Sequence, residues 1–362
     1  MFRFKGGHAP PSRLILSPLA GVSDLPFRLI AREHGCALAF AEMISAKALS
    51  RRSARTVAML RTDPADIPLG VQLLGSDTEA LARATELLCE RRPAVLDFNA
   101  ACPARKVVRR GEGAALLKDP SALVALLRTM AARSTVPVTV KIRSGWDASS
   151  PPAREIALRA REAGVRAVFI HGRTMRQGYS GAVDYGAIRA VRDALDIPVI
   201  ASGDALSPAL VKKLFDETGC HGVLIARGAL GNPWIFRAAE ELLAGRPAPP
   251  PPSPGAVAEV MARHLALCCG HYGEALGSTV FRKHFAWYTR GITGAKPFRE
   301  RAFRAGTMAE MLDLIEALGA ARGGEAPRLP PSPCTPRSAP SAQSRPSLST
   351  PYGGLQPARR PR

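Results

Sequence analysis

Two polar side chains stand inside apolar runs that have the pattern of buried β-strands. Lys141 interrupts the run VTVKIR, and Gln72 interrupts the run LGVQLL. Because an unpaired ammonium is costly to bury, Lys141 must face a partner. It could form a Schiff base with a carbonyl substrate. It could instead stand beside an electron-rich cofactor ring, such as the polar edge of a reduced flavin, which the amide of Gln72 would also suit. Neither residue decides between these chemistries.

Two glycine-containing segments could hold a phosphate group. They read ASGD at 201–204 and ARGALGNP at 226–233, and each follows a predicted strand. Small residues let backbone N–H groups approach an anion, and the loops after the last two strands are the usual phosphate site of a (β/α)8 barrel. Arg227 could add a charge-assisted hydrogen bond. The chain lacks a GxGxxG fingerprint with its downstream acid, so a Rossmann dinucleotide site is disfavoured.

These segments belong to a regular alternation of short apolar runs and helical patterns. Eight candidate strands begin near Leu14, Leu38, Pro68, Val95, Pro137, Ala167, Pro198 and Gly222. They recur about every 30 residues, which is the length of one strand–helix unit. Eight such units match a closed (β/α)8 barrel better than an open doubly wound sheet.

In a closed parallel barrel the carboxyl ends of all strands meet on one face, where the active site is built. The residues at those ends are therefore candidates even without a motif. They are Pro18, Leu19, Ala20, Gly21, Glu42, Gln72, Asn99, Cys102, Lys141, Arg143, His171, Arg173, Ser202, Gly203, Asp204, Ala226, Arg227 and Gly228. A polar residue at any one strand end often just caps a turn, but such residues at all eight ends favour a site.

Proline marks two boundaries after the predicted barrel, which we assign to residues 1–246. A proline-rich linker occupies 247–254, and 255–320 shows helical patterns without strands. Residues 321–362 are rich in proline, serine and arginine, and they cannot bury enough surface to offset the entropy of ordering. The predicted fold class is α/β, a (β/α)8 TIM barrel followed by a small α-helical domain and a disordered C-terminal tail.

The chain is strongly basic, with 50 Lys and Arg against 30 Asp and Glu and a formal net charge of +20. Residues 282–304 hold seven basic residues and a single acid, Glu300, which suits a polyanion such as a nucleic acid. The seven cysteines are scattered without a CxxC pair, and no apolar run reaches the roughly 18 residues of a membrane span. We expect a cytoplasmic protein with no membrane segment and no metal site.

Specific motifs follow one another along the chain. They are PLAGVSDLPFR, GVQLLGSD, FNAACPARKVV, GEGAALLKDP, VTVKIRSGWD, IHGRTMRQGYSG, IPVIASGD, TGCHGVLIARGALGNPWIF and RKHFAWYTRG. In this order and spacing, over about residues 12–315, they closely resemble the tRNA-dihydrouridine synthase family of bacterial type. The resemblance implies a flavin-dependent barrel with a C-terminal helical tRNA-binding domain, which reduces uridine in tRNA to 5,6-dihydrouridine with FMN and NADPH. It does not extend to residues 321–362.

The resemblance also implies a role for each matching residue. Asn99 matches the asparagine that contacts uracil, and Cys102 matches the catalytic cysteine that gives a proton to C5 once a hydride has reached C6. We assign Arg173, Arg282 and Lys283 to tRNA as well, and we expect a monomer. The positions that match FMN contacts are Pro18, Leu19, Ala20, Gln72, Lys141, His171, Ser202, Gly203, Asp204, Ala226 and Arg227, the last five at the phosphate.

Three positions depart from the family pattern. Ala101 replaces a glycine just before Cys102, Ser202 replaces an asparagine, and Ala226 replaces the glycine before Arg227. Alanine substitutes for glycine without strain only where φ is negative. The backbone at Ala101 and Ala226 therefore decides whether these changes matter.

The sequence leaves the state of the thiol and two other functions open. With the ordinary pKa of about 8.5 a thiol is mostly protonated at neutral pH, but Arg105 and Lys106 beside Cys102 would favour a thiolate. A flavin barrel acting on a free small molecule, such as a dihydroorotate dehydrogenase, would leave the basic helical domain unexplained. A non-catalytic RNA-binding protein on a decayed barrel would fit the charge, but the presence of Cys102 and Lys141 argues against it.

Overall fold

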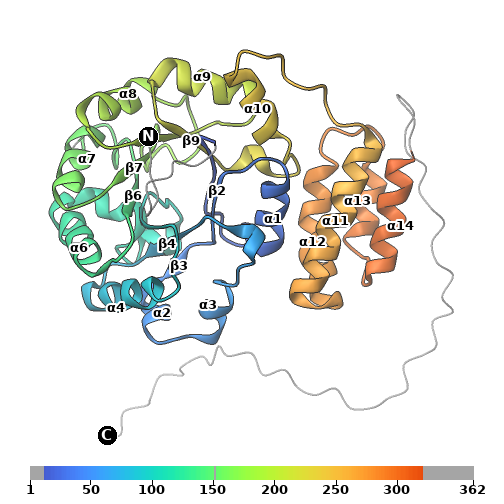
Figure 1. Ribbon diagram of the computed structural model, residues 1–362, viewed down its shortest axis with the longest axis horizontal. Coiled ribbons are helices and arrows are strands. Elements are labelled where there is room, and N and C mark those ends of the chain that lie inside the picture. The colour runs from blue at the N-terminus through green and yellow to red at the C-terminus, as the bar shows by residue number, and fades with distance from the viewer. Residues whose placement is uncertain (1–11, 151, 321–362) are drawn as a thin grey trace, which may run out of the picture. The chain divides into compact units, whose positions relative to one another are not determined.

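The computed structural model describes residues 12–150 and 152–320. In these residues a closed parallel sheet is ringed by helices and is followed by a helical bundle (Figure 1). The segment 321–362, for which we predict disorder, lies outside the described residues. No helix in the described ranges is long and apolar enough to cross a lipid bilayer.

The strands are β1 (Leu14–Leu16), β2 (Leu38–Phe40), β3 (Ile44–Ser45), β4 (Leu69–Leu74), β5 (Val95–Ala100), β6 (Val138–Arg143), β7 (Ala167–His171), β8 (Val199–Ser202) and β9 (Gly222–Ile225). Neighbours pair in parallel from β4 through β9 to β1 and β2, and β2 closes the ring by pairing with β4. The short β3 continues the line of β2 along β4. The predicted (β/α)8 barrel is confirmed, and each predicted strand begins within one residue of its observed start.

A bulge separates β2 from β3. Phe40 pairs with Gly70 and Ile44 with Leu73, so four steps along one strand face three along the other. An extra residue of this kind bends a strand and redirects its side chains, and such bulges are common at the rims of barrels. The bulge contains Glu42 and Met43, which follow the carboxyl end of β2.

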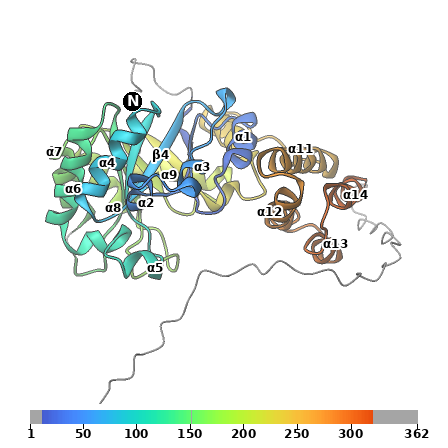
Figure 2. The ribbon, with the colours of Figure 1, turned by 90° about the horizontal axis from the view of Figure 1, so that it is seen from below.

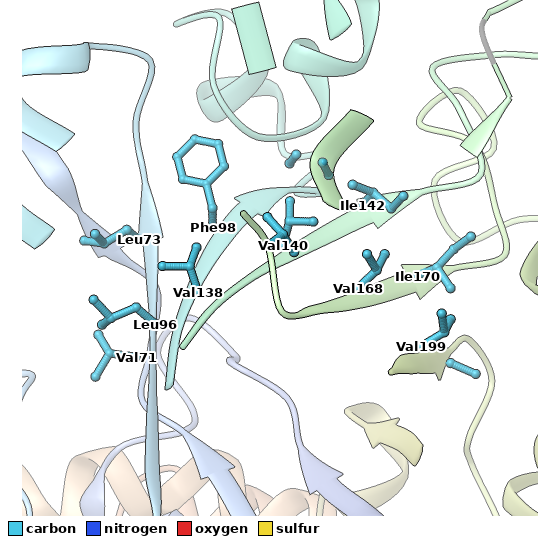
Figure 3. Close-up of a cluster of buried hydrophobic side chains, with 14 of the residues drawn as sticks. Val71, Leu73, Leu96, Phe98, Val138, Val140, Ile142, Val168, Ile170 and Val199 are labelled. Atoms are coloured by element: carbon cyan, nitrogen blue, oxygen red, sulfur yellow. The ribbon is translucent and has the colours of Figure 1, made fainter. Parts of the chain in front are cut away.

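The strands bury apolar side chains on both faces. Outward-facing Val71, Leu73, Phe98, Val140 and Ile170 pack against the surrounding helices (Figure 3). Away from the carboxyl ends of the strands, the barrel interior is filled by apolar side chains. They are Ile15, Leu38, Phe40, Val95, Ala167, Phe169, Ile200 and Leu224. This apolar filling closes one end of the barrel, so the polar interior positions lie toward the carboxyl ends of the strands.

Several helices around the sheet begin at a polar N-cap residue. Asp77, Asp119 and Ser207 each accept a hydrogen bond from a backbone N–H of the first turn. The barrel contains α1 (Leu25–Glu33), α2 (Ala46–Ser50), α3 (Ala54–Ala58), η1 (Pro64–Asp66), α4 (Thr78–Cys89), α5 (Arg105–Val108), η2 (Gly113–Lys118), α6 (Pro120–Arg133), α7 (Ala153–Glu162), α8 (Tyr185–Ala194), α9 (Pro208–Thr218), η3 (Arg227–Ala229) and α10 (Ile235–Leu243).

The helices that follow have an apolar core of their own, which includes Met261, Phe281 and Leu314. They are α11 (Pro254–Tyr272), α12 (Glu274–Tyr288), α13 (Lys296–Ala302) and α14 (Met308–Gly319). Helix α11 lies against α1 of the barrel (Figure 2). The Tyr272 hydroxyl donates to Asp24 Oδ2 at 2.8 Å across this contact.

Candidate active site

A cavity of about 300 Å³ lies at the carboxyl ends of the strands. Its lining includes every residue that we assign to the cofactor, together with Asn99 and Cys102. A larger cavity of about 810 Å³ lies where β4, β5 and β6 begin, and it is lined mainly by apolar side chains. Chemistry and not volume identifies the smaller cavity as the candidate site, because it alone of the two collects a thiol, an ammonium and an imidazole.

Hydrogen bonds link three buried side chains at the base of this cavity. Gln72 Nε2 donates to Asp97 Oδ2 at 2.7 Å, and Asn99 Nδ2 donates to Gln72 Oε1 at 2.7 Å. The other oxygen of Asp97 accepts from Thr139 Oγ1 at 2.6 Å. Burial raises the pKa of the Asp97 carboxyl to about 6, although its bonds to Thr139 and Gln72 and the charge of Lys141 oppose this. Asp97 is therefore mainly ionised at neutral pH.

Asn99 also shapes the turn that carries Cys102. Its Oδ1 accepts from the backbone N–H of Ala101 at 3.0 Å and from that of Cys102 at 2.9 Å. The carbonyl of Cys102 in turn accepts from Ala114 N at 3.1 Å. The thiol is thus placed beside the cavity by a turn that is tied both to β5 and to η2.

The departures from the family pattern at Ala101 and Ala226 are accommodated by the backbone. Among the described residues, the non-glycine positions with positive φ are Arg52, Arg92 and Asp204. Ala226 has φ −116°. Neither alanine therefore occupies a conformation that only glycine adopts freely.

Lys141 lies in the cavity wall without a close carboxylate. Its Nζ is 3.5 Å from Ser202 Oγ, and no ion pair of Lys141 occurs within the described part of the chain. Burial lowers the pKa of the lysine to about 8, Arg143 adds to the effect, and Asp97 and Cys102 oppose it. Lys141 is still mostly an ammonium at neutral pH, with N–H donors available to a ligand.

His171 presents an unused ring nitrogen in the same wall. Its Nδ1 is buried and has no hydrogen-bond partner in the structure. Burial, followed by the charges of Lys141, Arg143, Arg173 and Arg227, lowers the pKa of the imidazole to about 2. The ring is therefore neutral, and it can donate from one nitrogen and accept at the other.

An ion-paired cluster closes the side of the cavity near β8 and β9. Asp204, at φ +48°, pairs with Arg173 at 2.5 Å and with Arg227 at 2.9 Å. Arg173 also donates to Gly181 O at 2.6 Å, so its guanidinium is committed, and it does not line the cavity. Arg173, which we predict to bind substrate, is placed to hold Asp204. Arg227 remains partly exposed and lines the cavity.

Comparison with known proteins identifies the family of this protein. The family model described as "Dihydrouridine synthase (Dus)" matches residues 15–322. The chain belongs to the dihydrouridine synthase family. It is 38% identical over 295 residues to tRNA-dihydrouridine synthase B of Pseudomonas aeruginosa, covering 81% of this chain and 89% of the relative. It is 36% identical over 310 residues to a probable tRNA-dihydrouridine synthase of Rhodobacter capsulatus, covering 85% and 94%.

A solved structure of 2-naphthoyl-CoA reductase with 2-naphthoyl-CoA shares the fold. The TM-score is 0.52 at 10% sequence identity, and the match covers 77% of this chain. This chain spans about half of the reductase, 54% of its length. At this identity the likeness concerns the fold alone.

Two further residues shape the site of this family member, and the sequence assigned no role to them. Arg143, 2% exposed, donates to Ala101 O at 2.8 Å and to Gly178 O at 2.8 Å, and so joins the Cys102 turn to the loop after β7. Tyr179, 59% exposed, lines the cavity with its ring 4.9 Å from the Arg227 guanidinium. Arg143 was visible as a strand-end residue, whereas nothing in the spacing marked Tyr179.

Asp97 was missed, although the sequence contains a signal for it. It precedes Asn99 by two residues on one strand, so both side chains face the barrel interior. A carboxylate inside an apolar strand needs partners just as Lys141 does. The same argument that nominates Lys141 would have nominated Asp97.

Neither of the two basic residues that we assign to tRNA on α12 lines the cavity. Arg282 Nη2 donates to the carbonyl oxygen of Ala305 at 2.6 Å within the bundle. Lys283 Nζ donates to the carbonyl of Gly21, whose N–H donates to Glu42. Lys283 therefore holds the loop that carries Pro18, Leu19 and Ala20 into the cavity lining.

Proposed function

We propose that this protein is a tRNA-dihydrouridine synthase that uses FMN and NADPH to reduce the C5–C6 double bond of specific uridines, with Cys102 as the proton donor. The observation that carries the proposal is the meeting of Asn99, Cys102, Lys141 and His171 in one cavity of a member of this family. We further propose that residues 1–246 form the catalytic domain, that 255–320 bind tRNA, and that the enzyme acts as a cytoplasmic monomer.

The cavity residues fit a flavin. Lys141 has N–H donors without a carboxylate acceptor, and His171 has an unpartnered buried nitrogen. An ammonium beside the N1 and O2 edge of a flavin stabilises the negative charge of its reduced form, and a neutral imidazole can donate a hydrogen bond to the same edge. Bound here, FMN would supply hydride transfer from NADPH to uracil. Ser202, Gly203 and Arg227 would hold its phosphate, with Asp204 orienting Arg227.

Side chains of the protein would then bind the uracil ring and protonate it. A base within a folded tRNA cannot reach a barrel mouth unless its nucleotide is extruded from the stack. Asn99 would hold the ring by hydrogen bonding. Cys102, fixed by the turn that Asn99 caps, would donate a proton from its Sγ to C5 and recover it from solvent.

Replacement of the thiol tests this function. We expect Cys102→Ala to retain flavin reduction by NADPH but to lower dihydrouridine formation by about 100-fold or more, because a general acid contributes on this scale. Stopped-flow flavin absorbance and mass spectrometry of the tRNA measure the two steps. Cys268→Ala, which removes a buried thiol of the bundle, is the matched control and should leave both rates near those of the wild type.

Several results would contradict the proposal. A colourless protein that cannot be reconstituted with FMN would reject the flavin, and full turnover of Cys102→Ala would reject the proton donor. Flavin reduction without any dihydrouridine in tRNA would favour an enzyme of free small molecules. Comparison of tRNA from cells with and without the protein would identify the uridines that it modifies.

A further inference from the structure

The hydrogen bonds from Asp97 through Gln72 to Asn99 have a fixed direction. An ionised carboxylate only accepts hydrogen bonds, so Asp97 requires Gln72 to turn its NH2 group downward. This leaves Gln72 Oε1 facing Asn99, which therefore donates. The Asp97 carboxylate thus fixes the orientation of the Gln72 amide, and the Gln72 amide fixes that of Asn99.

The opposite end of the series requires the same orientation. Asn99 Oδ1 accepts from two backbone N–H groups, those of Ala101 and Cys102. Rotation of the Asn99 amide by half a turn would set its NH2 against both of these donors and would break its bond to Gln72. All three side chains are at most 3% exposed, so water does not readily replace a lost partner.

One N–H of Asn99 remains available to a ligand. It points to Met43 Sδ at 3.0 Å, and both Asn99 and Met43 line the cavity. A thioether is a weak acceptor, and a carbonyl oxygen is a stronger one. A carbonyl oxygen that enters the cavity can therefore replace Met43 Sδ as the acceptor of this N–H.

We propose that Asp97 is a positioning residue that acts through Gln72 to make Asn99 present an N–H, and not a carbonyl oxygen, to a carbonyl group of the substrate base. The inference rests on the proposed function, because it takes the base to be uracil. On this proposal Asn99 acts as a hydrogen-bond donor to the base. Asp97 orients Asn99, which is a purpose distinct from balancing the charge of Lys141.

Two substitutions separate these purposes, since both remove the charge of Asp97. In Asp97→Asn the new amide can turn its oxygen to Gln72 while its NH2 donates to Thr139 Oγ1, so the series keeps its direction. In Asp97→Leu no acceptor remains for Gln72. Should Asp97→Leu yield no soluble protein, Asp97→Ala removes the same acceptor without added bulk.

We expect Asp97→Leu to lower kcat for dihydrouridine formation about 10- to 100-fold, the usual effect of losing one or two oriented hydrogen bonds, and Asp97→Asn to stay within about threefold of the wild type. Flavin reduction by NADPH should change little in either. The Kd for tRNA should stay near the wild-type value in both variants, because phosphate contacts dominate tRNA binding. Equal losses in both variants would assign Asp97 to charge balance and overturn the proposal, and so would the absence of loss in both.

The reactivity of Cys102 gives a readout that needs neither FMN nor turnover. Because Asn99 Oδ1 caps the Cys102 turn, loss of its orientation should loosen that turn. Peptide mass spectrometry should show alkylation of Cys102 by iodoacetamide severalfold faster in Asp97→Leu than in Asp97→Asn. Equal rates would count against the inference. A wild-type enzyme that forms no dihydrouridine would refute the proposed function instead, and the alkylation rates would still report on the orientation of Asn99.

Discussion

The barrel and the helical bundle both bury polar side chains, and they differ in how these are partnered. At the base of the barrel cavity, Asp97, Gln72 and Asn99 form a hydrogen-bonded series. In the bundle, the rings of His264 and His284 lie 4.3 Å apart, and three of their four nitrogens have no partner; the fourth meets the Tyr288 hydroxyl at 3.1 Å.

The contrast shows that burial of a polar group does not by itself mark a reactive site. Partners in the barrel orient each amide and leave one donor facing a cavity. The two histidines of the bundle instead pack as neutral rings against Phe27 and Phe281, and neither lines the candidate cavity. Oriented partners together with an opening therefore point to chemistry, whereas unpartnered rings in an apolar core point to packing.

The largest difference between the two regions should follow from replacing one lysine in each. Lys141→Met removes a cavity cation, and we expect dihydrouridine formation to fall by about 100-fold or more through lost electrostatic stabilisation. Lys283→Met releases the Gly21 carbonyl and should lower turnover by less than about tenfold, the effect of roughly one charge-assisted hydrogen bond. Steady-state assays on tRNA provide the comparison, and similar losses would place both lysines in the same role.

The same Lys283→Met variant tests the predicted contact with tRNA. A lysine that neutralises one phosphate should reduce the slope of log Kd against log salt by roughly one unit. Because Lys283 Nζ meets a backbone carbonyl of the barrel, we expect a smaller change than this. A decrease of a full unit in this slope would show that Lys283 contacts a tRNA phosphate.

The buried histidines should make the fold sensitive to acid. Burial lowers the pKa of His264 to about 3 and also holds that of His284 well below 6.5, so the unfolded chain takes up protons first as pH falls. Their contribution to stability is complete above about pH 6.5 and declines below it, by up to about 1.4 kcal/mol per pH unit for each histidine.

Urea unfolding between pH 7.5 and 5 would measure this decline. The double variant His264→Phe with His284→Phe should have a shallower pH dependence while forming dihydrouridine normally at pH 7.5. Residual acid sensitivity is expected from His171, whose pKa burial lowers to about 2. An unchanged slope in the double variant would show that these rings are not protonated on unfolding.

The smallest effects concern two glycines, one in each region. A Cβ at Gly70 would lie 2.5 Å from the Phe40 ring inside the barrel, so Gly70→Ala should cost about 1–3 kcal/mol of stability. Gly270 lies in α11 with open space around it, so Gly270→Ala should add about 0.5–1 kcal/mol. Thermal unfolding distinguishes the signs, and a tolerated Gly70→Ala would mean that the barrel interior can repack.

Much of the barrel could be predicted from the sequence because its signals are local. The eight strands and the gathering of their carboxyl ends at one face follow from patterns within about 30 residues and from the geometry of closed barrels. The same reasoning predicts that Cys102 and Lys141 lie at one face of the barrel, and they line one cavity. The bulge between β2 and β3 escaped it, because a one-residue mismatch exists only relative to the partner strand.

By itself, the sequence determined the family, the barrel and the list of residues at its mouth, because hydrophobic periodicity and motif order are properties of the chain alone. Only the tertiary structure decided which way those residues act. Gln72 and Asp97 are 25 positions apart and Lys283 and Gly21 are 262 apart, yet each pair shares a hydrogen bond. The direction of a hydrogen bond depends on what the folded chain brings against each polar atom, and spacing along the sequence carries no record of it.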